Sequence, residues 1–281
     1  MIENRKRILV TGANGYIGQG VIRELKKYPI DIIAADYRFD SKEADIKYVE
    51  KNLFDDGFVG EVGNVDILLH LAWRDGFKHF SHTHIDDMPK HFAFLNKMID
   101  AGVSQICCLG SMHEVGFYEG CIDENTPTNP ISYYGIAKNA LRQLLELLVK
   151  DKAITYQWIR GYYIVGNTHK GCSIFSKITE AEMRGDVKFP FTTGMNQYDF
   201  IDYDIFCKQI AATVMQHEVT GIINCCSGTP ERLKDRVERF IEESGYHIVL
   251  DYGAFQDRPY DSKAVWGSTK KIDAIMQEAV Q

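Results

Sequence analysis

The sequence predicts an α/β fold, in which a doubly wound parallel sheet carries a small C-terminal substrate lobe. Short β-rich apolar runs alternate with amphipathic stretches through much of the 281-residue chain. Such alternation is typical of parallel sheets covered by helices on both faces. The first apolar run, residues 7–11, opens into a glycine-rich turn and then an amphipathic stretch to about Lys27. We expect 1–166 to form the dinucleotide-binding core, 167–281 mainly to form the lobe, and 199–225 to return to the core.

The remaining elements follow from the same patterns. Further strands are expected at residues 31–35, 46–49, 65–71, 105–109 and 155–160. Helices are expected at about 88–101 and over the stretch that ends near Leu148, with a loop at 161–166. The later part predicts helices at 174–184, 205–215, 233–243 and 270–279, and strands at 199–202 and 221–225. No linker separates a second domain, which favours a lobe assembled from pieces over an independent unit.

The turn after the first strand is the strongest local signal. Its first glycine permits a tight turn, its second lets the backbone approach a pyrophosphate, and its third lets the helix pack closely on the strand. The following helix directs its N-terminus at the phosphates. This arrangement indicates a Rossmann-type cofactor site formed by Gly12, Asn14, Gly15, Tyr16, Ile17 and Gly18.

Asp36 ends the second predicted strand, about 20 residues beyond the glycines, where a carboxylate suits the hydroxyls of the adenosine ribose. It would repel a 2′-phosphate, so NAD is favoured over NADP, although Arg38 partly offsets that repulsion. A simple strand-ending turn residue is the alternative. Ligands of such sheets bind at the carboxyl ends of strands. We therefore expect the cofactor crevice to be completed by Asn52, Leu53, Leu71, Ala72 and Trp73.

Tyr134 and Lys138 are four residues apart on a predicted helix, so they share one face. An ammonium group beside a phenol favours the phenolate, which predicts a lowered Tyr134 pKa. Such a tyrosine can exchange a proton with a carbonyl or an alcohol. A surface tyrosine and lysine on an amphipathic helix are the alternative for this spacing alone. Tyr133 is excluded because its fourth neighbour, residue 137, is alanine.

The composition of the chain limits the classes of partner that it is expected to bind. Hydrophobic residues make up 45% and charged residues 25%, and the net charge of −7 includes no basic block. These values argue against nucleic acid or an anionic membrane as the main partner. No apolar run approaches the roughly 20 residues of a membrane span, and the N-terminal apolar run is too short for a signal peptide. The seven cysteines form no C-x-x-C pair, which favours free thiols in a reducing cytoplasm.

Taken in chain order, these motifs resemble the extended branch of the short-chain dehydrogenase/reductase superfamily, within its nucleotide-sugar epimerase/dehydratase/reductase group. The resemblance covers nearly the whole chain. Its pieces are residues 11–18, Asp36, 70–72, 110–111 with Gly116, 129–130 ahead of 134–138, 200–202, Gly228 after Asn224, and 258–259.

The resemblance implies roles for particular residues. Tyr134 would donate or accept the proton, and Lys138 would lower its pKa and bind the nicotinamide ribose. Ser111 would hydrogen-bond the reacting oxygen and polarise the carbonyl. His113 would be a second acid or base, or a substrate contact, with a locally hydrogen-bonded histidine as the alternative. The resemblance also implies that this chain forms a homodimer through the Tyr134 helix and the helix before it.

Other substrate contacts are expected in the lobe. Epimerases of the group usually place an asparagine that touches the nucleotide diphosphate where this chain has Tyr163. Arg258 is the expected phosphate clamp, because arginine can bind phosphate through two hydrogen bonds; a surface arginine is the alternative. We expect no metal, because the spacing of His79, His82 and His84 fits a solvated loop better than a metal site.

Departures from the family pattern narrow the reaction. Ser111-Met112-His113 replaces the Thr-Asp-Glu trio of the dehydratases, which counts against dehydration. The helix expected at 88–101 lacks the usual asparagine at its start, and Asp86 or Asp87 would substitute for it.

The first functional hypothesis is NAD(P)H-dependent reduction of a nucleotide-linked 4-keto-6-deoxysugar, which the short lobe favours. The alternatives are an NAD-dependent nucleotide-sugar 4-epimerase, then a sugar or sugar-acid dehydrogenase, then a non-catalytic NAD-binding protein. The presence of both Tyr134 and Lys138 argues against the last of these.

Overall fold

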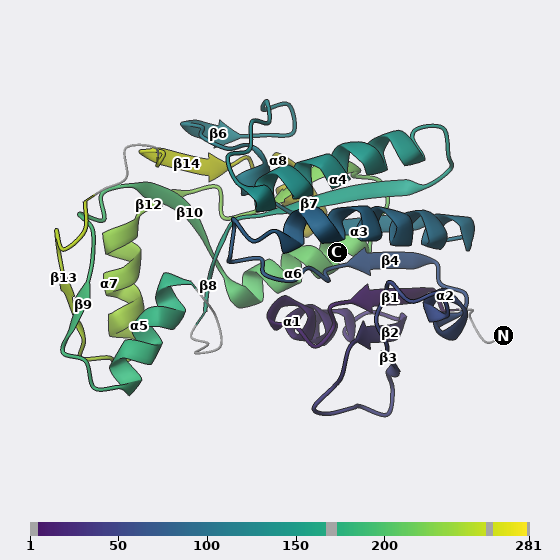
Figure 1. Cartoon of the computed structure of the whole chain (residues 1–281), viewed down its shortest axis with the longest axis horizontal. Helices are drawn as coiled ribbons and strands as arrows, with labels where there is room; N and C mark the ends of the chain where they lie inside the picture. Colours follow the sequence, from purple (N-terminus) through teal and green to yellow (C-terminus); the bar gives the residue numbers. More distant parts are fainter. Residues whose placement is uncertain (1–4, 167–172, 257–260, 280–281) are drawn as a thin grey trace.

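The main sheet of the computed structural model contains seven parallel strands in the order β11-β7-β5-β4-β1-β2-β3 (Figure 1). The structure describes residues 5–166, 173–256 and 261–279. The strands are β1 (Arg7–Thr11), β2 (Asp31–Asp36), β3 (Lys47–Glu50), β4 (Ile67–His70), β5 (Gln105–Ser111), β7 (Thr155–Gly161) and β11 (Gly221–Cys225). Since β4 lies on one side of β1 and β2 on the other, the strand order reverses there, which opens a ligand crevice at their carboxyl ends. The predicted fold class is confirmed.

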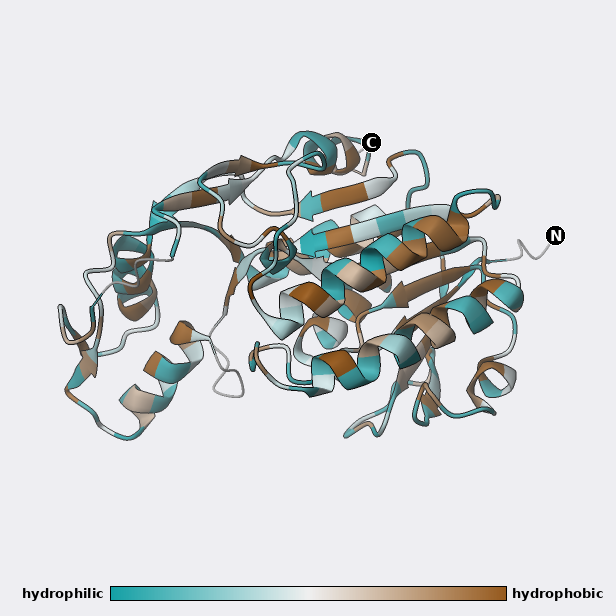
Figure 2. Ribbon diagram, turned by 45° about the horizontal axis from the view of Figure 1, so that its top comes forward, coloured by the Kyte–Doolittle hydropathy of each residue, from teal (hydrophilic) through white to brown (hydrophobic). Residues whose placement is uncertain are grey.

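Helices cover both faces of this sheet. One face carries α1 (Tyr16–Leu25), α6 (Tyr203–Val214) and α8 (Lys270–Glu278). The other carries α2 (Phe58–Val62), α3 (Thr83–Asp100) and α4 (Tyr133–Val149). Figure 2 shows hydrophobic and hydrophilic residues alternating along these helices, as expected when each helix buries one face.

A smaller second layer lies beyond the carboxyl ends of the main sheet. Its central sheet joins β12 (Pro230–Arg232), β10 (Gln197–Asp202), β14 (Ala264–Gly267) and β6 (Gly120–Ile122), and β8 (Tyr163–Val165) also pairs with β10. A two-stranded sheet of β9 (Lys188–Pro190) and β13 (Val249–Asp251) lies near α5 (Ile174–Met183) and α7 (Leu233–Glu243) at the far end (Figure 1). Phenylalanines 175, 191, 200 and 240 form much of its core. The domain boundaries remain predictions.

Helix α2 and the short strands β6, β9, β12, β13 and β14 were not expected, and two expected elements differ. Helix α3 begins at Thr83 rather than near Met88, because the helix continues through Pro89. The hydroxyl of Thr83 donates to Asp75 at 3.0 Å and fixes this earlier start. The expected loop at 161–166 contains β8, because its backbone pairs with the end of β10. Within the described residues, no helix is both long and apolar enough to cross a membrane.

Candidate active site

Helix α4 carries Tyr134 and Lys138 to the carboxyl end of β5. Ser132 caps the helix, its hydroxyl accepting from the backbone N–H of Gly135 at 3.1 Å. Gly135 has no space for a side chain, since a Cβ there would lie 2.4 Å from the carbonyl oxygen of His113. The first turn of α4 therefore packs directly on the short 3-10 turn η1 (Met112–Glu114) that follows β5.

Tyr134 is surrounded by aromatic rings. The His79 ring stacks on it at 5.1 Å between centroids with an interplanar angle of 14°. The rings of His84 and Trp73 lie at 5.3 Å and 6.3 Å. This burial raises the pKa of Tyr134 to about 12, and a side-chain hydrogen bond with Ser111 opposes the rise. The phenol is therefore protonated at neutral pH.

Lys138 is almost completely buried, with 4% of its surface exposed. Its Nζ donates to the carbonyl oxygen of Leu109 at 2.7 Å and lies 3.9 Å from the centroid of the Trp73 ring. Burial lowers the pKa of Lys138 to about 8, while Glu114 and Cys108 act to raise it. The predicted lowering of the Tyr134 pKa by Lys138 is wrong for this arrangement, because burial dominates and the ammonium is directed at Leu109 and Trp73.

Ser111 is the last residue of β5, and its conformation is fixed from both sides. Its hydroxyl accepts from the backbone N–H of His113 at 3.3 Å, and its own backbone N–H donates to Oε1 of Glu114 at 2.7 Å. The His113 ring lies edge-on to His79 at 4.4 Å and to Tyr134 at 6.2 Å. Burial lowers the pKa of His113 to about 3, so this imidazole is neutral and a poor proton donor at physiological pH.

The glycine turn has the shape of a phosphate cradle. Gly12 has a φ of +69°, and a Cβ there would lie 2.8 Å from the backbone of Ala72. A Cβ on Gly18 would lie 2.2 Å from the carbonyl oxygen of Gly12, so only glycine permits this approach of helix and strand. Beside the turn is a pocket lined by Gly12, Ala35, Asp36, Tyr37, Lys51, Leu53, Phe58 and Ala72. Four of the predicted cofactor residues, Gly12, Asp36, Leu53 and Ala72, therefore line one pocket.

Asp36 lies against this turn. Its Oδ2 accepts from the backbone N–H of Asn14 at 2.9 Å, and Oδ1 accepts from that of Tyr37 at 2.8 Å. Two other predicted cofactor residues have local partners. Tyr16 stacks on Tyr203 with 4.3 Å between ring centroids, and Oδ1 of Asn52 accepts from Phe54 N–H at 3.1 Å.

The remaining predicted cofactor residues lie near this turn. Ile17 packs partly buried against the core beneath α1, and Leu71 is buried in the same core. Trp73 donates its indole N–H to Nδ1 of His84 at 3.0 Å. Trp73 thus lies beside the Tyr134–Lys138 face.

Tyr163 faces the second layer. Its ring lies 4.8 Å from that of Tyr198 and 6.2 Å from that of His113, so it connects the lobe with the Ser111 turn. Arg258 lies outside the described residues. No group of histidine, cysteine, aspartate or glutamate in the described ranges has the arrangement of a metal site.

The sequence reasoning misread two residues of the site, His79 and His84, and missed a third, Glu114. The solvated-loop interpretation is wrong for His84, which is 1% exposed and packs beneath Tyr134, and for His79, whose ring covers the phenol. Glu114 was not singled out, although the Ser-x-x-Glu spacing of residues 111–114 is a capping-box signal that could have found it.

The sequence matches a family of known proteins. A family model described as "NAD dependent epimerase/dehydratase family" matches residues 8–226. The chain is 40% identical over 269 residues to a dTDP-6-deoxy-L-talose 4-dehydrogenase (NAD(+)) of Aggregatibacter actinomycetemcomitans, covering 93% of this chain and 99% of the relative.

Solved structures show the same fold. A UDP-glucose 4-epimerase superposes with a TM-score of 0.84 at 17% identity, covering 96% of this chain and 91% of that one. DesIV, a dTDP-glucose 4,6-dehydratase of Streptomyces venezuelae with NAD and TYD bound, gives a TM-score of 0.82 at 18% identity, covering 95% and 90%. At these identities the likeness concerns the fold alone.

Proposed function

Because the chain belongs to the NAD-dependent epimerase/dehydratase family, we propose that it interconverts a hydroxyl and a keto group at C4 of a dTDP-linked 6-deoxyhexose. The family and the glycine turn at Gly12–Gly18 both support an NAD-dependent oxidoreductase. The observation that carries the finer proposal is the 40% identity to the 6-deoxy-talose 4-dehydrogenase, which extends over 99% of that protein and so includes the lobe.

The side chains of α4 and β5 support this chemistry. Tyr134 exchanges a proton with the sugar oxygen, and the Ser111 hydroxyl donates a hydrogen bond to the same oxygen. When bound, NAD accepts or donates the hydride. A phenol that is protonated at neutral pH suits the proton donor of the reductive direction.

The cofactor would lie along the described crevice. Gly12, Gly15 and Gly18 surround the pyrophosphate position, and Asp36 lies where the adenosine ribose would be bound. Lys138, Trp73 and Tyr134 form the nicotinamide end. The sugar then lies between Ser111 and the second layer, where His79, His113 and Tyr163 exclude water from the reacting carbon.

The test is a substrate panel with purified protein. With dTDP-6-deoxy-L-talose and NAD⁺ we expect the near-ultraviolet absorbance of NADH to rise, and with the 4-keto product and NADH we expect it to fall. UDP-glucose is the control nucleotide sugar. Conversion of UDP-glucose to a C4 epimer without net NADH formation would identify an epimerase instead, and inactivity towards all dTDP-6-deoxysugars would refute the proposal.

A further inference from the structure

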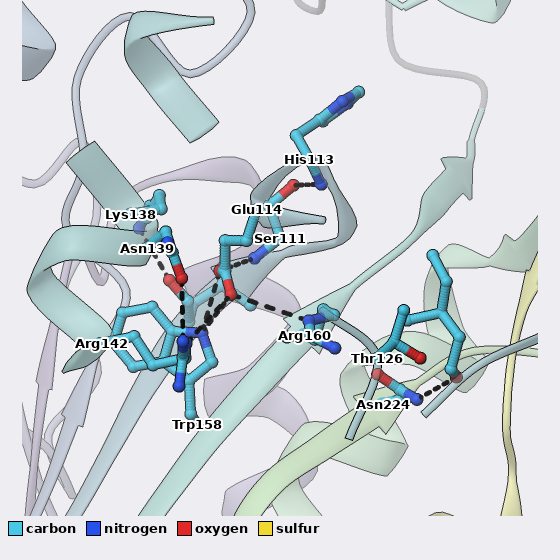
Figure 3. A network of polar contacts seen from close by, with 12 residues as sticks. Ser111, His113, Glu114, Thr126, Lys138, Asn139, Arg142, Trp158, Arg160 and Asn224 are labelled. Carbon is cyan, nitrogen blue, oxygen red and sulfur yellow. Dashed lines mark hydrogen bonds and ion pairs between the residues drawn. The ribbon is translucent and has the colours of Figure 1, made fainter. Parts of the chain in front are cut away.

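A completely buried carboxylate lies directly behind Ser111. Glu114 has none of its surface exposed, and its Oε1 accepts from the backbone N–H of Ser111 at 2.7 Å. The indole N–H of Trp158 donates to its two oxygens at 2.9 and 3.0 Å. Figure 3 shows the Glu114 carboxylate between Arg142 and Arg160, whose Nε atoms lie 3.9 and 3.7 Å from Oε2. This buried cluster of Ser111, Glu114, Arg142, Trp158 and Arg160 is called the Glu114 network below.

Each of these contacts presents a donor or a cation to Glu114. A protonated carboxyl would direct its hydrogen at one of them, so the arrangement fits the ionised form. Burial raises the pKa of Glu114, and the charges of Arg160 and Arg142 oppose that rise. A second carboxylate contributes to the balance of charge in this cluster, because Arg142 also donates to Oε1 of Glu146 at 2.8 Å. Two carboxylates therefore face two guanidinium groups.

The backbone is shaped to admit this carboxylate. A Cβ on Gly110 would lie 2.0 Å from Nε1 of Trp158 and 2.5 Å from Oε1 of Glu114. Only glycine at this position lets Glu114 and Trp158 meet beside the strand. The close packing therefore leaves Ser111 little freedom to move.

The network also joins the two elements that carry the proposed catalytic residues. Ser111 ends β5, whereas Arg142 lies on α4 one turn beyond Lys138. Lys138 itself donates to Leu109 on β5, two residues before Ser111. Glu114 thus links the end of β5 to helix α4, close to the part of α4 that carries Tyr134 and Lys138.

We propose that Glu114 is a positioning residue, which fixes the Ser111 hydroxyl relative to Tyr134 and keeps the Lys138 helix in register with β5. This inference rests on the proposed function, since it assumes that Ser111, Tyr134 and Lys138 carry the reaction. It assigns Glu114 no contact with the substrate.

The negative charge of Glu114 allows a test of the proposal, because it affects the pKa values of neighbouring residues. The charged and titratable groups facing Glu114 are Arg142, Lys138 and Tyr134 from α4, and Arg160 and Tyr156 from β7. The negative charge of Glu114 raises the pKa values of both Lys138 and Tyr134. Removing that charge leaves Glu146 as the one carboxylate facing the two arginines, so the pKa values of Lys138 and Tyr134 should both fall. A purely structural residue would not shift the pH dependence of turnover.

The first experiment uses Glu114→Gln in the full-length protein. The amide keeps an oxygen acceptor for Ser111 but removes the charge between the arginines. We expect kcat to fall about 10- to 100-fold through misplacement of Ser111, while the Kd for NADH changes less than about twofold. The limbs of the pH–kcat profile should move to lower pH by about half a unit or more. A wild-type kcat with a wild-type pH profile would overturn the inference.

A double-mutant cycle separates the inference from the proposed function. If Glu114 acts through Ser111, then Ser111→Ala should add little to the loss already caused by Glu114→Gln. Fully additive losses would overturn the positioning role and leave the proposed function intact. Near-normal activity of Ser111→Ala alone would remove Ser111 from the mechanism and overturn the inference, whereas inactivity of the wild type towards all dTDP-6-deoxysugars would refute the proposed function.

Two further variants guard against a folding artefact. Asp199→Asn is the matched control: Asp199 is equally buried and accepts from the backbone N–H groups of Ser227, Gly228 and Gly267, none of which belongs to the Glu114 network. It should lower Tm without shifting the pH–kcat profile. Should Glu114→Gln fail to fold, Arg142→Gln tests the same link, and we expect kcat to fall at least about threefold with NADH binding retained. Unchanged turnover in that variant would likewise overturn the proposal.

Discussion

The ammonium group of Lys138 lies 3.9 Å from the centroid of the Trp73 ring, which joins the segment after β4 to helix α4. Trp73 is itself held in place, since its ring stacks on His91 with 4.5 Å between centroids and an interplanar angle of 12°. An indole face stabilises a nearby cation, and more strongly when water is excluded. Trp73 is therefore a rigid platform for Lys138.

Replacing Trp73 should reveal this contact. For Trp73→Leu we expect kcat/KM to fall about 3- to 30-fold, the range that corresponds to a partly desolvated cation–π contact. Steady-state kinetics with NAD⁺ as the varied substrate would measure the loss. Trp73→Phe is the matched control, because it keeps an aromatic face and should retain most of the activity. Equal losses in both variants would show that the indole acts through its hydrogen bond to His84 instead.

Lys138 should also make stability depend on pH. Its pKa is lowered to about 8 by burial, so the charged form is disfavoured in the folded state and the folded protein releases this proton first as the pH rises. The destabilisation is present in full below the folded pKa and is relieved between that value and the unfolded pKa. Relative to Lys138→Met, wild type should therefore gain about 2 kcal/mol of unfolding free energy between about pH 7 and about pH 9.5.

Urea denaturation of both proteins at the two pH values measures this difference. Comparing the variants cancels the other groups that titrate in this range. A constant difference across the range would show that the Lys138 pKa is not lowered in the folded protein.

Local sequence motifs predicted most of the residues that make up the candidate site. The glycine turn, Asp36 and the Tyr134–Lys138 face depend on short-range spacing, and the family, the enzyme class and the NAD cofactor inferred from them are confirmed. The strands of the main sheet were also expected near their observed positions, because buried parallel strands form continuous apolar runs.

The rest depends on tertiary contacts that no local pattern contains. His79 and His84 resemble loop residues in the sequence, yet the start of α3 brings His84 against the Tyr134 ring, and the turn before α3 stacks His79 on it. The raised pKa of Tyr134 follows from its burial among these rings. The spacing of Tyr134 and Lys138 alone could not predict that burial. The start of α3 was missed because a proline is usually placed in the first turn of a helix, whereas Pro89 lies inside α3.

Tyr134→Phe tests the proton exchange directly. The substitution keeps the ring that stacks on His79 and removes only the hydroxyl, so the packing of α4 should survive. We expect kcat to fall on the order of 100-fold or more, with NADH binding retained. Tyr133→Phe is the matched control on the same helix, and it should leave turnover unchanged. A Tyr134→Phe enzyme of near-normal activity would remove the phenol from the mechanism.

Asp36 should determine the choice between NADH and NADPH. Its carboxylate lies at the end of β2 beside the glycine turn, with Oδ2 accepting from Asn14 at 2.9 Å. A 2′-phosphate placed there would meet a negative charge, whereas the exposed Arg38 nearby could attract it once that charge is removed. For Asp36→Asn we expect the ratio of kcat/KM for NADH to that for NADPH to fall at least about 10-fold.

The control for Asp36→Asn lies on the same strand. Asp31 begins β2 at its opposite end and is exposed, so Asp31→Asn makes the same chemical change away from the cofactor crevice. Its cofactor ratio should match that of the wild type. If wild-type enzyme already prefers NADPH, the charge of Arg38 outweighs that of Asp36, and Arg38→Ala should then reverse the preference.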